Sequence, residues 1–106
     1  MTGFGLVVRF TARDEDAVAA FDTLVAGALE GIRAHEPGTI VYVSHADADE
    51  PLVRVFYELY EDRAAFDRHE QQPHVRHFLA AREQYLTAVE VTFLNEVTGK
   101  RPGSAQ

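Results

Sequence analysis

The sequence predicts one α+β domain with the element order β-α-β-β-α-β, and three observations lead to this prediction. The 106 residues suffice for one hydrophobic core and leave no room for a second. Short runs of β-branched and aromatic residues alternate with longer segments of helical periodicity. Hydrophobic residues make up 46% of the chain and charged residues 25%, which is ordinary for a globular protein.

The first half of the chain predicts a strand, a long helix and a second strand. Residues 4–11 (FGLVVRFT) contain no turn-forming residue after Gly5, so we expect a strand there. Over residues 14–35, apolar side chains recur every three or four positions and acidic side chains gather at the start, which indicates an amphipathic helix. The sequence EPG at 36–38 ends this helix, and residues 39–45 form the next strand.

The second half predicts a hairpin strand, a broken helix and a last strand. The expected elements are a turn at 46–51, a strand at 52–60, a short helix capped by Asp62 and interrupted at Pro73, a helix at 74–86, a strand at 89–97 and a flexible tail at 99–106. The domain is thus expected to span residues 1–98. This order is that of the ferredoxin-like fold, a four-stranded antiparallel sheet with the helices on one face.

The predicted sheet carries large apolar side chains on both faces. In the first strand, for example, Val7 points away from the side to which Leu6 and Val8 point. The helices can cover only one face, and the other would expose a larger apolar patch than soluble monomers usually carry. We therefore expect a face-to-face homodimer. The alternative is a monomer with a curled, partly solvent-exposed sheet.

Charge and composition exclude several classes of function. Ten basic and seventeen acidic residues give a net charge of −7, which disfavours nucleic acids and anionic membranes as partners. The absence of cysteine excludes disulfides, Fe–S clusters and thiolate zinc sites. Neither a signal peptide nor an apolar run of membrane-spanning length is present, so we expect a cytoplasmic protein.

The segment 56–74 carries a distinctive pattern. It reads FYELYEDRAAFDRHEQQPH, and the sequence EPGT at 36–39 precedes the second strand. Together these motifs resemble the antibiotic biosynthesis monooxygenase (ABM) domain family, of the dimeric α/β barrel superfamily, over about residues 4–97. The resemblance implies a dimeric ferredoxin-like fold with a pocket between the helices and the sheet of each subunit. Many relatives oxidise quinols or polyphenolic polyketides with O2 and use no metal or flavin.

Glu58, His69 and Tyr60 are the candidate catalytic residues. Glu58 lies in mid-strand between aromatic neighbours, and burial would raise its pKa toward that of a general base. The alternative is a structural ion pair with Arg54 or Arg9. His69 lies on the helix expected to cover this face, where it would accept a substrate proton or pair with Glu58; alternatively, it bonds a backbone carbonyl or solvent. Tyr60 would donate a hydrogen bond to the substrate, or lie at the rim with a hydrated hydroxyl.

The candidate substrate-binding residues are aromatic or polar side chains expected near this pair: Arg54, Phe56, Phe66, His74, Phe78 and Tyr42. His45 is a weaker candidate of the same kind. The histidines at 69, 74 and 77 suggest a metal site, but Pro73 breaks the helical register between the first two. Their spacing is also one residue longer than that of the HExxH zinc motif. We expect neither a metal nor a cofactor.

The sequence therefore predicts a cofactor-independent monooxygenase acting with O2 on a quinol or a similar enolisable aromatic substrate. Two alternatives stay open. A branch of the family includes an isomerase of a small phosphorylated dione, for which Arg54, Arg76 and Arg82 would be the plausible phosphate-binding groups. The chain could also be a non-catalytic dimer that binds a small aromatic ligand.

Haem-degrading relatives offer a further comparison. They use a helix tryptophan, which this chain lacks, and an axial histidine at a position that falls near Phe78 or Leu79 here. Haem degradation is therefore not expected. Haem binding through His77 stays open.

Overall fold

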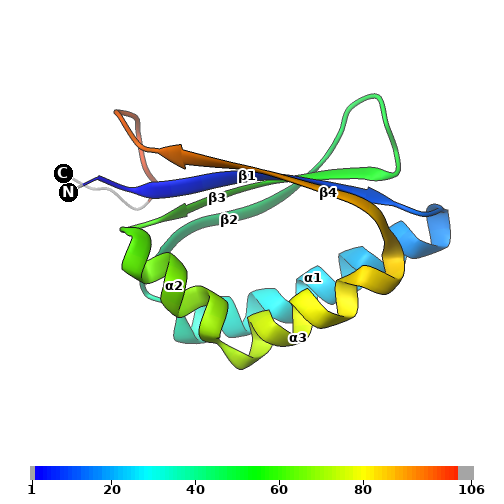
Figure 1. Cartoon of the computed structure of the whole chain (residues 1–106), viewed down its shortest axis with the longest axis horizontal. Coiled ribbons are helices and arrows are strands. Elements are labelled where there is room, and N and C mark those ends of the chain that lie inside the picture. The colour runs from blue at the N-terminus through cyan, green and yellow to red at the C-terminus, as the bar shows by residue number, and fades with distance from the viewer. Residues whose placement is uncertain (1, 103–106) are drawn as a thin grey trace.

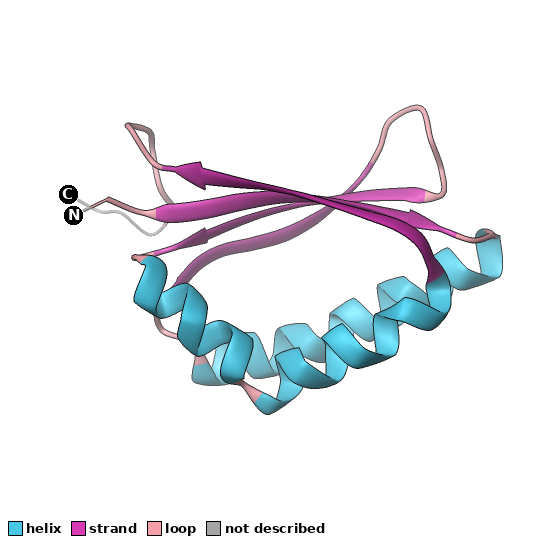
Figure 2. Cartoon of the chain, viewed as in Figure 1, coloured by secondary structure: helices cyan, strands magenta, loops and turns pink. Residues whose placement is uncertain are grey.

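Four strands and three α-helices follow one another in the predicted order in the computed structural model, which describes residues 2–102. The elements are β1 (Phe4–Ala12), α1 (Glu15–His35), β2 (Thr39–Ala46), β3 (Val53–Tyr60), α2 (Arg63–Gln71), α3 (Pro73–Ala81), a 3₁₀ turn (Arg82–Tyr85) and β4 (Leu86–Asn95). The strands form one antiparallel sheet in the order β2-β3-β1-β4. All the helices lie on one face of it (Figures 1 and 2), which confirms the predicted ferredoxin-like fold.

The helix starts follow from local sequence. Asp14 accepts a hydrogen bond from the backbone N–H of Ala17 at 2.8 Å, and Asp62 accepts one from Ala65 at the same distance. Both are N-caps that satisfy an amide group left free at the start of a helix. Pro73 occupies the first turn of α3, where its missing N–H costs no helical hydrogen bond. The chain therefore turns between α2 and α3 and starts a new helix at once (Figure 1).

Aromatic rings fill the core between α1, α3 and the sheet. The ring of Phe10 lies 4.8 Å from that of Phe56 and 5.0 Å from that of Phe21, centroid to centroid. Phe78 of α3 lies 5.8 Å from Phe21 of α1. Pairs of this kind contribute about 0.5–1.5 kcal/mol each beyond the area they bury. They hold both helices at fixed positions over the sheet.

The end of the last helix differs from the prediction. We expected a helix over 74–86 and a strand over 89–97, but α3 ends at Ala81 and β4 already begins at Leu86. Leu86 pairs with Ala12 at the far end of β1, beyond a register shift in that strand. This pairing is long-range, and the helical spacing of the apolar residues up to Leu86 gave no sign of it.

The face of the sheet opposite the helices also carries apolar side chains. Val43, Tyr57 and Leu94 point to this side and are 43%, 37% and 37% exposed. The loop between β2 and β3 and the segment after β4 rise on this side at opposite ends of the sheet (Figure 1). The apolar side chains therefore lie on a face with a raised border at each end. A single chain does not test the expected homodimer, which stays a prediction.

The segment after β4 has no regular secondary structure over residues 96–102. The backbone N–H of Glu96 donates to the carbonyl of Gly3 at 2.9 Å, and the side chain of Glu96 forms an ion pair with Arg101. The expected flexible tail at 99–106 is described only as far as residue 102, and residues 103–106 lie outside the described part of the chain.

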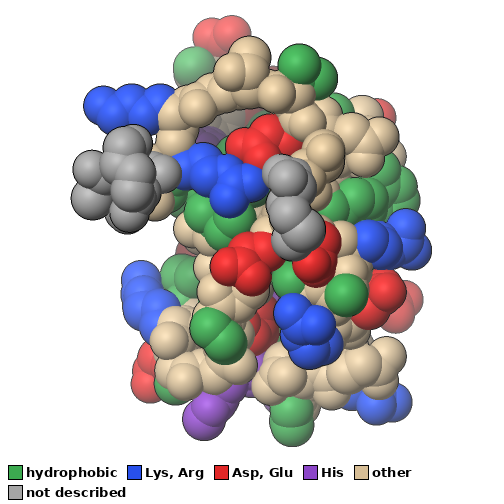
Figure 3. Space-filling model, turned by 90° about the vertical axis from the view of Figure 1, so that its left-hand side faces the viewer, with side chains coloured by type: hydrophobic (Ala, Val, Ile, Leu, Met, Phe, Trp, Pro, Cys, Tyr) green, Lys and Arg blue, Asp and Glu red, His purple; other side chains and the backbone are tan. Residues whose placement is uncertain are grey.

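Acidic and basic side chains are interspersed over the end of the molecule that Figure 3 shows. No helix in the described part of the chain combines the length and the apolar character needed to cross a bilayer.

Candidate active site

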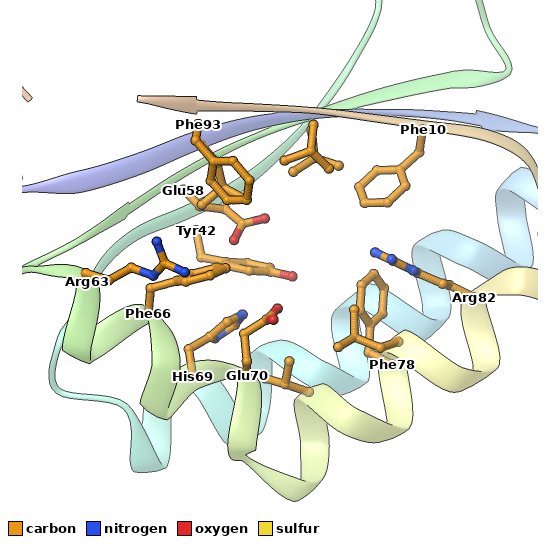
Figure 4. Close-up of a pocket in the computed structure, with 15 residues that line it drawn as sticks. Phe10, Tyr42, Glu58, Arg63, Phe66, His69, Glu70, Phe78, Arg82 and Phe93 are labelled. Atoms are coloured by element: carbon orange, nitrogen blue, oxygen red, sulfur yellow. The ribbon is translucent and has the colours of Figure 1, made fainter. Parts of the chain in front are cut away.

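A cavity of about 320 Å³ lies between the sheet and the helices α2 and α3 (Figure 4). Its apolar walls include Leu6, Val8, Phe10, Phe66, Phe78 and Phe93. The polar side chains that line it are Tyr42, Glu58, Arg63, His69, Glu70 and Arg82. Small-molecule sites in proteins begin at roughly 300 Å³ and combine apolar walls with a few polar groups. The cavity has the size and the composition of a site for a small molecule.

The cavity opens toward the edge strand β4. Val91 and Phe93 of β4 line it but remain 48% and 58% exposed. Residues deeper in the site are much better shielded: Glu58 is 5% exposed and His69 is 4% exposed. A ligand that enters past β4 would therefore meet the ionisable groups in a largely water-free environment.

His69 of α2 is fixed by Glu36, the residue that follows α1. Nδ1 of His69 lies 2.6 Å from Oε1 of Glu36, which also accepts a hydrogen bond from the Thr39 hydroxyl at 2.7 Å. Nε2 of His74 lies against the other carboxylate oxygen. Burial alone would raise the pKa of Glu36, but the hydrogen bonds from His69, Thr39 and His74 outweigh it and hold the pKa below its ordinary value. Glu36 is thus ionised at neutral pH.

The tautomer of His69 follows from this contact. An ionised carboxylate has no proton to donate, so Nδ1 of His69 carries the proton that joins it to Glu36. No hydrogen bond within residues 2–102 engages Nε2 of His69. In this part of the chain, every fully buried side-chain nitrogen or oxygen has a hydrogen-bond partner, so an atom without a partner cannot be fully buried. Nε2 therefore keeps accessible surface, and the ring points into the cavity (Figure 4). In the neutral ring this nitrogen carries a lone pair and is able to act as a base on the cavity wall.

Glu58 of β3 is held by Tyr60, two residues further along the same face of the strand. The Tyr60 hydroxyl donates to Oε1 of Glu58 at 2.6 Å. Burial raises the pKa of Glu58, and the hydrogen bond from Tyr60 offsets part of this rise. Burial and the charge of Glu58 also raise the pKa of Tyr60, which keeps its proton. Tyr60 is fully buried and is not among the residues that line the cavity, so it positions Glu58 instead of the substrate.

The alternative of an ion pair between Glu58 and an arginine is wrong. Arg54 pairs with Asp22 of α1 at 2.9 Å, and Arg9, on the opposite face of the sheet, pairs with Asp47 and Glu50. Arg54 shares a face with Glu58 but lies four residues, or roughly 13 Å, away along the strand. It therefore lies outside the cavity, and the structure does not bear out its prediction as a substrate-binding residue.

The other predicted residues fall into two groups. Tyr42, Phe66 and Phe78 line the cavity as expected. Phe56 is fully buried behind the wall, where its ring packs edge-on against that of Tyr42 at 5.6 Å. Glu58 and His69 share the cavity but form no hydrogen bond with each other, because Tyr60 and Glu36 hold them separately.

His74 lies on the far side of Glu36, away from the cavity. Its ring packs so closely on α1 that a Cβ at Gly31 would lie 2.3 Å from its Cγ. His74 therefore supports Glu36 and does not line the cavity, where a substrate-binding residue was expected from the sequence. Among residues 2–102, no three His, Cys, Asp or Glu side chains are grouped so as to hold a metal ion.

Sequence reasoning missed several polar residues of the site. Glu36 appeared only as part of a turn motif, and nothing in its local sequence predicts contact with a histidine 33 positions away. Arg63 and Glu70 were not singled out, and Arg82 was considered only as one of three scattered cations. Arg63 and Glu70 lie on the same helix as His69, which was the available signal for these two, whereas Arg82 follows the next helix.

Comparison with known proteins identifies the family. Residues 3–81 match the family described as Antibiotic biosynthesis monooxygenase. The solved structure of Rv0793 from Mycobacterium tuberculosis is 30% identical, with a TM-score of 0.82 over 92% of this chain and 97% of that one. PA3566 from Pseudomonas aeruginosa is 26% identical, with a TM-score of 0.74 over 92% and 97%.

A structure described as an antibiotic biosynthesis monooxygenase shares the fold at 22% identity, with a TM-score of 0.79 over 90% of this chain and 99% of that one. No curated protein matches the chain. The match to the family spans most of the chain and includes Glu36, Glu58, Tyr60 and His69. The chain therefore belongs to the antibiotic biosynthesis monooxygenase family.

Proposed function

We propose that this protein is a cofactor-independent monooxygenase that uses O2 to oxidise a quinol or a similar enolisable aromatic substrate. One observation carries the proposal: an imidazole nitrogen that no hydrogen bond within residues 2–102 engages, on a histidine held by a buried carboxylate, faces an apolar cavity that also holds Glu58. Membership of the family supports oxygenase chemistry as the reaction class.

The chemistry needs a base more than it needs a redox group. Removal of a phenolic proton gives a phenolate, which is rich enough in electrons to reduce O2. For hydroquinone, the balanced reaction is hydroquinone plus O2 to hydroxybenzoquinone plus water. One oxygen atom enters the ring, the other leaves as water, and the substrate supplies all four electrons. No further reductant is required.

His69 would take the first proton through Nε2. The imidazolium that forms would lie directly against the ionised carboxylate of Glu36, which stabilises the new positive charge. Glu58, whose pKa is raised by burial, would take the second proton. Both protons then pass to the oxygen atom that leaves as water.

Tyr42 would stabilise the phenolate. It lines the cavity, and burial together with the charges of Glu58 and Glu36 raises its pKa well above the ordinary value. The hydroxyl therefore stays protonated and is able to donate a hydrogen bond to a developing negative charge.

The test is O2 uptake by the purified protein with a panel of substituted hydroquinones. We expect His69→Gln to lower uptake by about 10²–10⁴-fold, the usual contribution of a general base. His77→Gln is the matched control, because His77 is exposed on α3 and does not line the cavity. Equal uptake by the two variants would remove the assigned role of His69. Thermal stabilisation by a ligand without any uptake in the wild type would identify a non-catalytic binding protein instead.

The isomerase alternative is tested on the same samples. Solvent deuterium entering a small phosphorylated dione without O2 consumption would point to an isomerase and against the oxygenase proposal.

We also propose that the protein acts as a homodimer joined through the face of the sheet opposite the helices. The support is the exposure of Val43, Tyr57 and Leu94 on that face, which is apolar between its two raised borders. Light scattering should give a mass near twice the 11.8 kDa of one chain. The variant Tyr57→Asp should reduce it toward one chain, because the charge would be buried without a partner. A wild-type mass of one chain would contradict the dimer.

A further inference from the structure

Arg82 is placed at the cavity in a way that the proposed proton chemistry does not use. It begins the 3₁₀ turn after α3, and its guanidinium lies over two rings of the cavity wall, 5.5 Å from the centroid of Phe10 and 5.7 Å from that of Phe78. Figure 4 shows it entering the cavity from the end opposite to Arg63. Glu58 and His69 lie toward the Arg63 end, so the cavity has an acid–base end and a cationic end.

Among the residues that the structure describes, Arg82 has no carboxylate partner, whereas comparable arginines do. Within residues 2–102, four arginines are half-buried: Arg9, Arg54, Arg82 and Arg101. Arg9, Arg54 and Arg101 each form an ion pair with an aspartate or a glutamate. In the same described part of the chain, no hydrogen bond or ion pair engages Arg82. The chain contains seventeen acidic residues, so the missing ion pair of Arg82 is not explained by a shortage of carboxylates.

The guanidinium is available to an anion. It lies near two aromatic rings, and no hydrogen bond within residues 2–102 uses its N–H groups, which are able to donate two parallel hydrogen bonds to a carboxylate. Its positive charge also reaches the acid–base end, where it acts to lower the pKa of Glu58 and of Tyr42. Glu70 lines the cavity too and would repel an anion, but it lies beside His69 and away from Arg82 (Figure 4).

We propose that the substrate is an aromatic acid, a phenol or quinol that also carries a carboxylate, with the carboxylate on Arg82 and the phenolic hydroxyl at His69. This inference rests on the proposed function for the identity of the reacting hydroxyl. It adds the charge of the substrate and its orientation in the cavity. A volume of about 320 Å³ accommodates one ring with such substituents and leaves room for O2.

The test compares three ligands of nearly equal size by calorimetric titration at neutral pH: 2,5-dihydroxybenzoate, the uncharged 2,5-dihydroxybenzamide and 4-hydroxyphenyl phosphate. We expect the wild type to bind the benzoate about tenfold more tightly than the benzamide, the ratio that a charge-assisted hydrogen bond gives. Arg82→Gln should abolish this preference, and Arg82→Lys should restore only part of it, because lysine lacks the planar fork.

Arg63→Gln is the matched control. Arg63 lines the same cavity and its loss changes the net charge equally, but it already pairs with Asp67 at 3.3 Å. It should keep the preference for the benzoate. Far-UV circular dichroism and thermal unfolding establish that each variant is folded before titration.

Several results would overturn the inference. These are equal affinities of the wild type for benzoate and benzamide, a preference that survives Arg82→Gln, an equal loss in Arg63→Gln, or no binding of any of the three ligands. If 4-hydroxyphenyl phosphate binds more tightly than the benzoate, the anion held by Arg82 is a phosphate, and the proposal of a carboxylate substrate is wrong. Because binding needs no turnover, a preference for the benzoate without O2 uptake would sink the proposed function and leave standing the binding of an aromatic carboxylate at Arg82.

Discussion

Replacement of Glu36 by glutamine tests the group on which the site depends. The carboxylate accepts hydrogen bonds from His69, Thr39 and His74, and its side chain is almost fully buried. Glutamine keeps the shape, and its oxygen is able to accept the bonds from His69 and Thr39 at one side. Its NH2 group then faces Nε2 of His74, and the negative charge is lost.

The expected loss of stability is about 1.5–3 kcal/mol, the value of one hydrogen bond to a charged group. For a domain of this size, that corresponds to a fall in Tm of ~10 °C. In this variant the imidazolium form of His69 also loses its counter-charge. O2 uptake should therefore fall about tenfold, which corresponds to a loss of about 1.4 kcal/mol of transition-state stabilisation. Glu30→Gln on the exposed side of α1 is the control and should change stability by less than about 0.5 kcal/mol.

The pH dependence of the effect gives the sharper result. The pKa of Glu36 is lower in the folded protein than in the unfolded chain, so its ionisation stabilises the fold. This stabilisation is complete at pH values above the pKa of the unfolded state, and it is lost as the pH falls through the pKa of the folded state. Urea unfolding at fixed protein concentration should therefore show the full difference between wild type and Glu36→Gln near pH 7. The difference should close at strongly acidic pH. A difference of equal size at both pH values, or none near pH 7, would refute this account of Glu36.

Two further substitutions test other contacts of the site. Tyr60→Phe removes the hydrogen bond that lowers the pKa of Glu58, so the pKa of Glu58 should rise. The acid limb of the curve of O2 uptake against pH should then move to higher pH. An unmoved limb would show that O2 uptake does not require ionised Glu58. Gly31→Ala would place a Cβ 2.3 Å from the ring of His74 and should destabilise the protein by about 1–3 kcal/mol. A Cβ at Gly27, on the same helix, would have no atom of the described residues within 4 Å, so Gly27→Ala should stabilise the protein by up to ~1 kcal/mol. Equal effects of the two substitutions would contradict the close packing of His74 on α1.

Local patterns were sufficient to predict most of the fold. The cap at Asp62, the acidic residues at the start of α1 and its apolar stripe depend on residues within a few positions of one another, and both helices begin close to where these signals place them. The alternation in β3 also placed Glu58 and Tyr60 on the face that the helices cover. The start of β4 at Leu86 was not predictable, because it depends on pairing with the distant strand β1.

The site was predictable only in part, for the same reason. Glu58 and His69 were singled out mainly through the resemblance to the family, and strand alternation placed Glu58 on the face that the helix of His69 was expected to cover. The group that fixes His69 comes from the end of α1, and the partner of Arg54 comes from its middle. Neither contact follows from spacing along the chain, since each depends on how α1 lies over the sheet. Such contacts between distant segments decide which residues face the cavity.

The tautomer of His69 is the most direct test of the central claim, that a base fixed by Glu36 faces an apolar cavity. Nitrogen-15 NMR of histidine-labelled protein at alkaline pH, with His69→Gln to assign the signal, distinguishes the two ring nitrogens. The account predicts a proton on Nδ1 and none on Nε2, and a change in the Nε2 signal when a phenolic ligand binds. A proton on Nε2, or an Nε2 signal that a bound phenol leaves unchanged, would contradict it.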